Sequence, residues 1–283
     1  MVRQYLPTVV SRGLGGELRQ LRKARGLTAL VVCRQLGWQP SRLSRMETGQ
    51  QGIRPEDVAS LLVIYGVIGA ERKRLLAMTE RAGERGWWEL LGPGLTSWSK
   101  TFFQLEAQAT RLASWQPLLV PGLLQTEDYT RAVMRAAGIP EADARVRVAA
   151  RQGRQAILNR PQPPRFHAIV DEIALRRVLG DRRVMARQLR CLIELAETPH
   201  IRLSVLPLAV GGHPGLDGAF LILDFEREPS VVHQEQRMSS VFLEEPEQVA
   251  AFRRVADRLA AMALSPTRSV EFIAQAAIEH ERK

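Results

Sequence analysis

The first eighty residues carry apolar side chains at helical spacing, separated by residues that end helices. Apolar residues at positions i, i+4 and i+7 predict a first helix whose inward face is formed by Leu14, Leu18 and Leu21. Gly26 ends this helix, Thr28 can cap a second one, and Gly37 ends the second. Short helices separated by tight turns are therefore predicted for this part of the chain.

A third helix is predicted directly after the second turn. Pro40 suits its first position, because the N–H that proline lacks would be unpaired there, whereas Gln39 is a poor N-cap residue. Leu43 and Met46 face inward. The outward positions are polar: Ser41, Arg42, Ser44 and Arg45. This segment is therefore an amphipathic helix with a polar outer face.

A fourth helix is predicted from Pro55 and a fifth over residues 70–85. Five short helices with a tight turn between the second and the third are typical of a helix-turn-helix domain. We therefore expect an all-α helix-turn-helix domain over residues 1–85.

The remaining residues, 86–283, change from helical to strand periodicity. Helices are predicted over residues 98–112, 127–137, 141–158, 181–196, 247–263 and 269–280, and strands over residues 165–170, 201–206, 219–225, 231–235 and 240–243. Because short turns containing Gly or Pro join the strands, we expect an α+β domain with a mainly antiparallel sheet. We assign this second domain to dimerisation and to the reception of a signal.

The basic charge lies almost entirely in the first domain. The chain has 40 Lys and Arg against 30 Asp and Glu, a net charge of +10. Residues 1–85 hold 15 basic and 7 acidic residues, and residues 86–283 hold 25 and 23. A basic excess confined to one small domain is the electrostatic footprint of a nucleic-acid binder, although a well-solvated surface has the same composition.

The composition argues against several other classes of protein. The longest apolar runs reach about ten residues, too short for a membrane helix, and the start of the chain lacks a signal-peptide core, so a cytoplasmic protein is expected. Two cysteines cannot form a disulfide framework or a zinc site by themselves. We expect no metal, no other cofactor and no catalytic residues. The alternative is an enzyme with a metal or acid/base site. In that case His213, and His233 with Glu235, would converge with Asp171 or Glu172.

The segment RGLTALVVCRQLGWQPSRLSRMETGQQ resembles the Xre-type, lambda-repressor-like helix-turn-helix domain. The resemblance implies that the third helix reads bases of double-stranded DNA in the major groove, with these residues: Gln39, Ser41, Arg42, Ser44 and Arg45. Nearby basic residues are better suited to phosphates: Arg22, Lys23 and Arg54. Because operators of such domains usually have two-fold symmetry, a homodimer is expected.

The second domain also resembles a known group. WQPLLVPGLLQTEDYTRAV and VDEIALRRVLG are similar to the C-terminal domain, of unknown function, of WhiJ-like or antitoxin-like actinobacterial regulators. The resemblance implies a transcriptional regulator that responds to a small partner protein. A small-molecule effector is the other signal that we expect the second domain to receive. The alternative is an antitoxin-like protein that mainly binds a small partner protein and regulates its own operon.

Aromatic residues gather at the start of the second domain. A cleft lined by them would suit a small ligand or a peptide, and the candidate residues are Trp88, Trp98, Phe102, Glu106, Trp115, Gln125 and Tyr129. Ordinary core packing explains the same residues, so both interpretations stay open.

Overall fold

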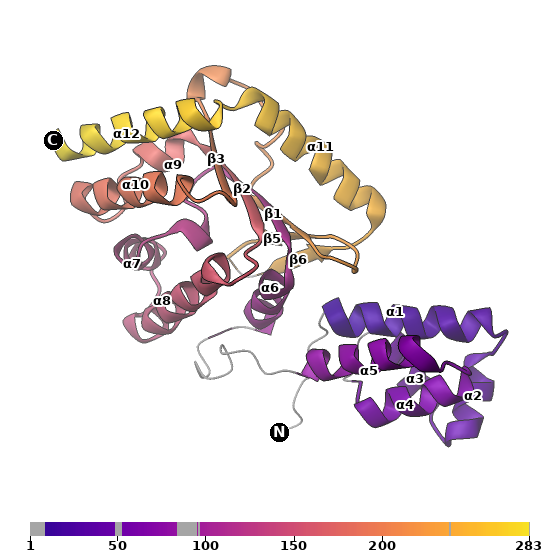
Figure 1. Cartoon of the computed structure of the whole chain (residues 1–283). Coiled ribbons are helices and arrows are strands. Elements are labelled where there is room, and N and C mark those ends of the chain that lie inside the picture. Colours follow the sequence, from indigo (N-terminus) through magenta and orange to yellow (C-terminus); the bar gives the residue numbers. More distant parts are fainter. Residues whose placement is uncertain (1–8, 49–52, 84–94, 96, 238, 283) are drawn as a thin grey trace. The chain divides into compact units, whose positions relative to one another are not determined.

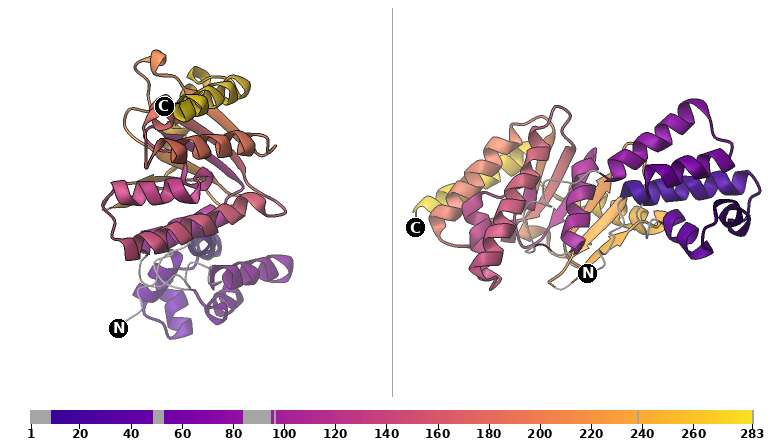
Figure 2. Two further views of the ribbon diagram at one scale, coloured as in Figure 1. Left: turned by 90° about the vertical axis from the view of Figure 1, so that its left-hand side faces the viewer. Right: turned by 90° about the horizontal axis from the view of Figure 1, so that it is seen from below.

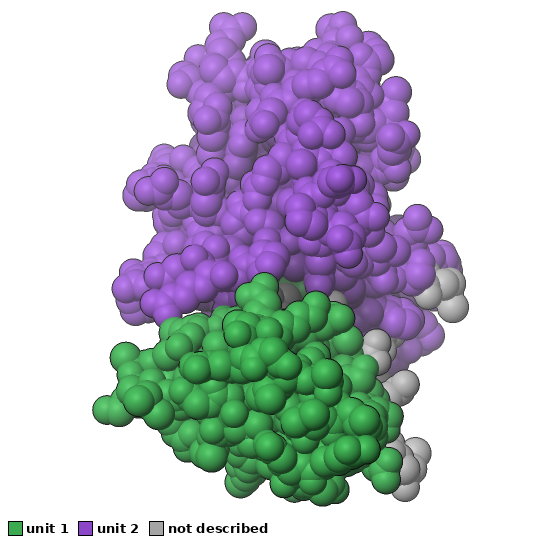
Figure 3. Space-filling model, turned by 90° about the vertical axis from the view of Figure 1, so that its right-hand side faces the viewer, with its two compact units in different colours: residues 1–89, 99–105 green, residues 90–98, 106–283 purple. Residues whose placement is uncertain are grey.

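The computed structural model describes residues 9–48, 53–83, 95, 97–237 and 239–282 (Figure 1). The chain divides into two compact units, which are coloured separately in Figure 3. Unit 1 comprises residues 1–89 and 99–105, and unit 2 comprises residues 90–98 and 106–283.

Unit 1 is helical over its described residues, as the periodicity predicts. Its helices are α1 (Val9–Ala24), α2 (Ala29–Leu36), α3 (Pro40–Glu47), α4 (Pro55–Ile64) and α5 (Gly69–Gly83). The Oγ1 atom of Thr28 accepts a hydrogen bond from the backbone N–H of Val31, which caps α2 as expected. Gly37 ends α2 with φ +67°, a left-handed conformation that glycine adopts without steric cost. Leu14 and Leu18 are fully buried in the core of this unit.

Unit 2 is built around one six-stranded sheet. The helices and strands from residue 97 onward are α6 (Ser97–Gln108), β1 (Arg111–Gln116), η2 (Gly122–Leu124), α7 (Glu127–Ala136), α8 (Glu141–Gln155), η3 (Ala156–Asn159), β2 (Arg165–Asp171), α9 (Glu172–Arg176), α10 (Arg182–Ala196), β3 (Ile201–Leu206), η4 (Leu208–Val210), β4 (Phe220–Asp224), β5 (Val231–Glu235), β6 (Ser240–Leu243), α11 (Pro246–Met262) and α12 (Pro266–Arg282). The strand order is β3-β2-β1-β4-β5-β6.

The sheet is mixed, so the expectation of a mainly antiparallel sheet is wrong. Strands β1, β2 and β3 are parallel to one another, and β1, β4, β5 and β6 form antiparallel pairs. The chain between β1 and β2 contains α7 and α8, and the chain between β2 and β3 contains α9 and α10. Such helical crossovers return the chain to the same end of the sheet, which makes the joined strands parallel. The sequence pattern does not predict strand β1, because its first residues continue the apolar spacing of the preceding helix.

Helices cover both faces of this sheet. Helix α11 lies on one face, where it contacts β1, β3, β4 and β5 (Figure 1). On the other side, α12, α10, α7 and α8 follow one another across the unit (Figure 2, left). The core on the α11 side includes the buried side chains of Trp115, Ile169, Phe220 and Ile222. Alternate residues of each strand therefore face α11.

Candidate functional site

The outer face of α3 is polar and accessible. Gln39, Ser41, Ser44 and Arg45 are all exposed, whereas Leu43 and Met46 on the same helix are fully buried. Gln39 makes no side-chain cap hydrogen bond, in agreement with the expectation that it is a poor N-cap residue. Residues at the N-terminal end of α3 are thus available to a ligand while the opposite face anchors the helix.

Arg42 is held against its own unit. One of its Nη atoms donates a hydrogen bond to Oδ1 of Asp57 on α4, at 2.8 Å. Its guanidinium carbon lies 4.3 Å from the ring centroid of Trp38, a cation–π distance. About a third of the side chain stays exposed. These two contacts orient Arg42 and reduce its freedom to reach outward.

Arg22 is buried inside unit 1, which corrects the expectation that it contacts a DNA phosphate. Its side chain is buried, and its Nε and Nη2 atoms bind the two carboxylate oxygens of Glu47 at 2.6 and 2.8 Å. Its Nη1 atom donates to the carbonyl oxygen of Leu27 at 2.9 Å. The bonds to Glu47 raise the pKa of Arg22. Sequence spacing alone could not identify this partner, which lies 25 residues further along the chain.

Lys23 and Arg54 are exposed. Lys23 lies in the last turn of α1, and Arg54 occupies the N-cap position of α4. Both cations therefore lie on the surface of unit 1, where a phosphate can reach them.

Within unit 2, the described residues of the expected aromatic cleft lie in different parts of the fold. Trp88 lies outside the described residues, and Trp98 is partly exposed on α6. Trp115 is fully buried on the α11 side of the sheet, where its Nε1 atom donates to the carbonyl oxygen of Gly215. Gln125 and Tyr129 are buried at η2 and α7, away from α11. Phe102 is buried on α6. Phe102, Trp115 and Tyr129 therefore occupy buried, core positions.

The polar side chains among the cleft candidates, Tyr129, Gln125 and Glu106, form hydrogen bonds within unit 2. Tyr129 accepts a hydrogen bond from the backbone N–H of Val120, and burial raises the pKa of its hydroxyl. Gln125 accepts from Arg151 at 2.7 Å, and burial lowers the pKa of this arginine to about 10. Glu106 is 1% exposed and holds Arg154 through two bonds of 2.6 and 2.7 Å. The two arginines, which no sequence motif singles out, stabilise the packing of α8.

The histidine–carboxylate cluster that an enzyme would require is formed only in part. His213 Nε2 lies 3.8 Å from Oδ2 of Asp171, but His233 lies elsewhere, bound to Ser240 Oγ at 2.6 Å. Asp171 also caps α9 by accepting from the N–H of Ile173. No group of three or more potential metal ligands is found among the described residues.

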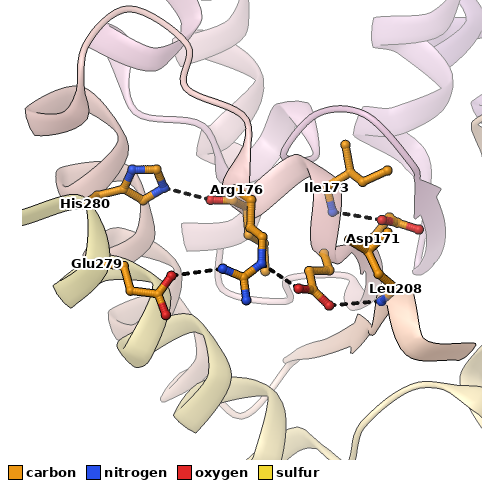
Figure 4. Close-up of polar contacts among 8 residues, drawn as sticks. Asp171, Ile173, Arg176, Leu208, Glu279 and His280 are labelled. Atoms are coloured by element: carbon orange, nitrogen blue, oxygen red, sulfur yellow. Dashed lines mark hydrogen bonds and ion pairs between the residues drawn. The ribbon is translucent and has the colours of Figure 1, made fainter. Parts of the chain in front are cut away.

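Glu172 has a structural role as well. Its carboxylate accepts from the backbone N–H of Leu208 and from Arg176 (Figure 4). Arg176 also donates to Glu279 on α12, and the neighbouring His280 contacts the carbonyl oxygen of Leu175. These bonds tie the short helix α9 to α12 and to the loop after β3.

Two family models match the chain. Residues 14–75 match a helix-turn-helix domain, and residues 99–275 match a domain of unknown function, DUF5753. No curated protein and no solved structure matches the chain. Among the described helices, none is long and apolar enough to cross a membrane.

Proposed function

The chain belongs to the DUF5753 family, and because its N-terminal residues also match a helix-turn-helix domain, we propose that it is a sequence-specific transcription regulator. The observation that carries this proposal is the outer face of α3. It presents exposed polar side chains from Ser41 to Arg45, while the buried face and two ion pairs fix the helix in its unit.

In the proposed complex, α3 enters the major groove of an operator. Arg45 is the base-reading cation, because a guanidinium can bind O6 and N7 of guanine at the same time. Ser41, Ser44 and Gln39 make less selective contacts with base edges. Arg42, which Asp57 and Trp38 orient, reads the adjacent base.

Phosphate contacts set the position of the domain on the duplex. Lys23 and Arg54 are exposed and suited to this role. The excess of basic residues in 1–85 adds a long-range attraction for DNA that does not depend on sequence.

The finer assignment rests on the resemblance to Xre-type and WhiJ-like regulators. In this assignment the protein binds as a homodimer, with half-sites about 34 Å apart, and unit 2 receives a signal. The proposal gives the chain no catalytic step.

Selection of bound fragments from a random double-stranded DNA library, using the full-length protein, tests the proposal. We expect one enriched motif, and we expect Arg45→Ala to weaken binding to it by about 1–3 kcal/mol, with a much smaller loss on random DNA. Arg268→Ala removes another exposed arginine, on α12, and is the matched control. A library that yields no motif would refute sequence-specific binding, and equal losses on motif and random DNA would limit Arg45 to phosphate contact.

A further inference from the structure

Unit 2 contains an open cavity between the sheet and α11. Its volume is about 630 Å³, within the range of small-molecule binding sites. Ala113 on β1 and Ala256 and Ala260 on α11 line it, and their short side chains leave space between the helix and the strands. No functional residue identified above explains this space.

The strand register arranges the lining of the cavity in tiers. Arg111 on β1 is flanked by Arg165 on β2 and by Asp224 on β4, at the entrance. Two residues further along β1, Ala113 is flanked by His167 and Ile222.

The third row of lining residues lies two residues further along the same strands. There Trp115 and Ile169 are neighbours, and both are buried. The wall thus changes from charged at the entrance to apolar at the inner end.

The lining of the cavity holds more cations than anions: four arginines, Arg111, Arg165, Arg202 and Arg253, against the carboxylates Asp224 and Asp257. Asp224 is paired with Arg253 and accepts a hydrogen bond from Ser230. The positive charge of Arg111 helps to lower the pKa of Asp224. By contrast, the guanidinium groups of Arg165 and Arg202 have neither an ion pair nor a hydrogen bond within the part of the chain that the structure describes. Three exposed arginines around one opening attract an anionic group.

Two histidines, His167 and His200, line the same wall. Burial lowers the pKa of His167 to about 4, with a smaller effect of Arg202, so the imidazole is uncharged at neutral pH. His167 is oriented by Ser204 Oγ, 3.0 Å from its Nε2 atom. His200 also lines the cavity, and its Nε2 atom is buried without a hydrogen-bond partner. A buried polar atom of this kind costs free energy unless a ligand or water satisfies it.

We propose that this cavity binds a small organic anion, with its carboxylate or phosphate among Arg111, Arg165 and Arg202 and its apolar body against Ala113 and Trp115. The inference concerns unit 2 alone and holds whether or not α3 binds DNA. It assigns a ligand site to the part of the chain that matches the domain of unknown function.

Ligand-detected NMR titration of the full-length protein tests the proposal with three probes that share one apolar body. Naphthalene-1-acetate carries a carboxylate, 1-naphthyl phosphate carries a phosphate, and naphthalene-1-ethanol is the neutral control. We expect at least one anionic probe to bind at least tenfold more tightly than the alcohol. Comparison of the two anions shows which group the arginines prefer.

Two kinds of variant test whether the probes bind in this cavity. Arg165→Gln combined with Arg202→Gln changes exposed side chains only, and we expect it to weaken anion binding at least tenfold. Ala260→Trp fills the cavity and should abolish binding of every probe. Arg268→Gln, on α12 and outside the lining, should leave binding unchanged.

The proposal is overturned if neither anion binds better than the alcohol. It is also overturned if the double arginine variant, shown by circular dichroism to be folded, binds the anions as tightly as the unmodified protein. If the Ala260→Trp variant does not fold, the double arginine variant alone decides the question.

Discussion

The guanidinium of Arg22 on α1 binds both carboxylate oxygens of Glu47, the last residue of α3, inside unit 1. The pair fixes the C-terminal end of α3 against α1, and Arg42–Asp57 ties the same helix to α4. The position of the polar outer face of α3 thus depends in part on a buried ion pair, Arg22–Glu47, on the opposite side of the helix.

Replacement of either member of the Arg22–Glu47 pair should strongly destabilise unit 1. Arg22→Met leaves a buried carboxylate without a cation, a change that costs about 3–5 kcal/mol in buried pairs. Urea unfolding measures the loss. The double variant Arg22→Met with Glu47→Leu should regain most of it, because no buried charge is left unpaired.

The partly exposed pair Arg74–Glu17 is the control for this prediction. Arg74→Met should cost less than about 1 kcal/mol, as is usual for ion pairs near the surface. Equal losses for Arg22→Met and Arg74→Met would show that burial does not determine the strength of the first pair.

Two adjacent glycines of α1 should respond in opposite ways to alanine. A Cβ atom at Gly15 would lie 2.3 Å from the carbonyl oxygen of Met46, whereas a Cβ atom at Gly16 meets nothing within 4 Å. Gly15→Ala should therefore force α1 and α3 apart and destabilise unit 1 by about 1–3 kcal/mol. Gly16→Ala should stabilise it by about 0.5–1 kcal/mol through helix propensity. Thermal unfolding of the two variants checks the prediction, and a stabilising Gly15→Ala would contradict the close packing of α1 on α3.

Arg54→Gln should weaken DNA binding without changing the preferred sequence. A phosphate contact contributes a slope of about −0.9 to the dependence of log K on log salt concentration, so the variant should have a slope shallower by about this amount. Fluorescence anisotropy at several salt concentrations, on motif and random DNA, measures it. A loss restricted to the motif would show instead that Arg54 reads a base.

Stability should decrease as pH falls below the ordinary pKa of histidine. Burial lowers the pKa of His167 to about 4 and that of His233 to about 3, so both stay neutral in the folded protein while the unfolded chain binds protons. Between about pH 6.5 and pH 4 the unfolded state therefore binds more protons, and each histidine lowers the free energy of unfolding by about 1.4 kcal/mol per pH unit.

Urea unfolding at pH 7.5, 6 and 5 measures this dependence. The variant with His167→Gln and His233→Gln should show a shallower decrease over the same interval. If the two proteins lose stability in parallel, other groups account for the pH dependence.

Local patterns predict most of the elements, because the signals involved act over a few residues. Helix α2 is capped by Thr28 and ended by Gly37, as their residue types indicate. Alternating apolar residues place the strands β2, β3, β5 and β6 close to their observed bounds. In contrast, the start of Arg111–Gln116 continues the apolar pattern of the preceding helix, so local patterns do not reveal β1.

This central strand decides the topology of the sheet. β1 is parallel to β2 and antiparallel to β4, so it joins the two halves. The short connections between β4, β5 and β6 do give antiparallel pairs, as the turn residues predict, but the two helical crossovers give parallel ones. The pairing of β1 depends on partners 50 or more residues away, which no local pattern contains.

Residue type and spacing along the chain predict most of the helices and strands, the location of the basic charge and the polar outer face of α3. These properties depend on neighbours within one or two helical turns, so residue type and spacing are sufficient. The tertiary structure shows that Arg22 is buried against Glu47 and that Trp115 lies on the α11 side of the sheet, apart from Tyr129 on α7. It also brought the arginines of three strands to one cavity entrance. Such relationships arise when distant segments pack, because burial and pairing depend on the three-dimensional neighbours of a side chain and not on its neighbours along the chain.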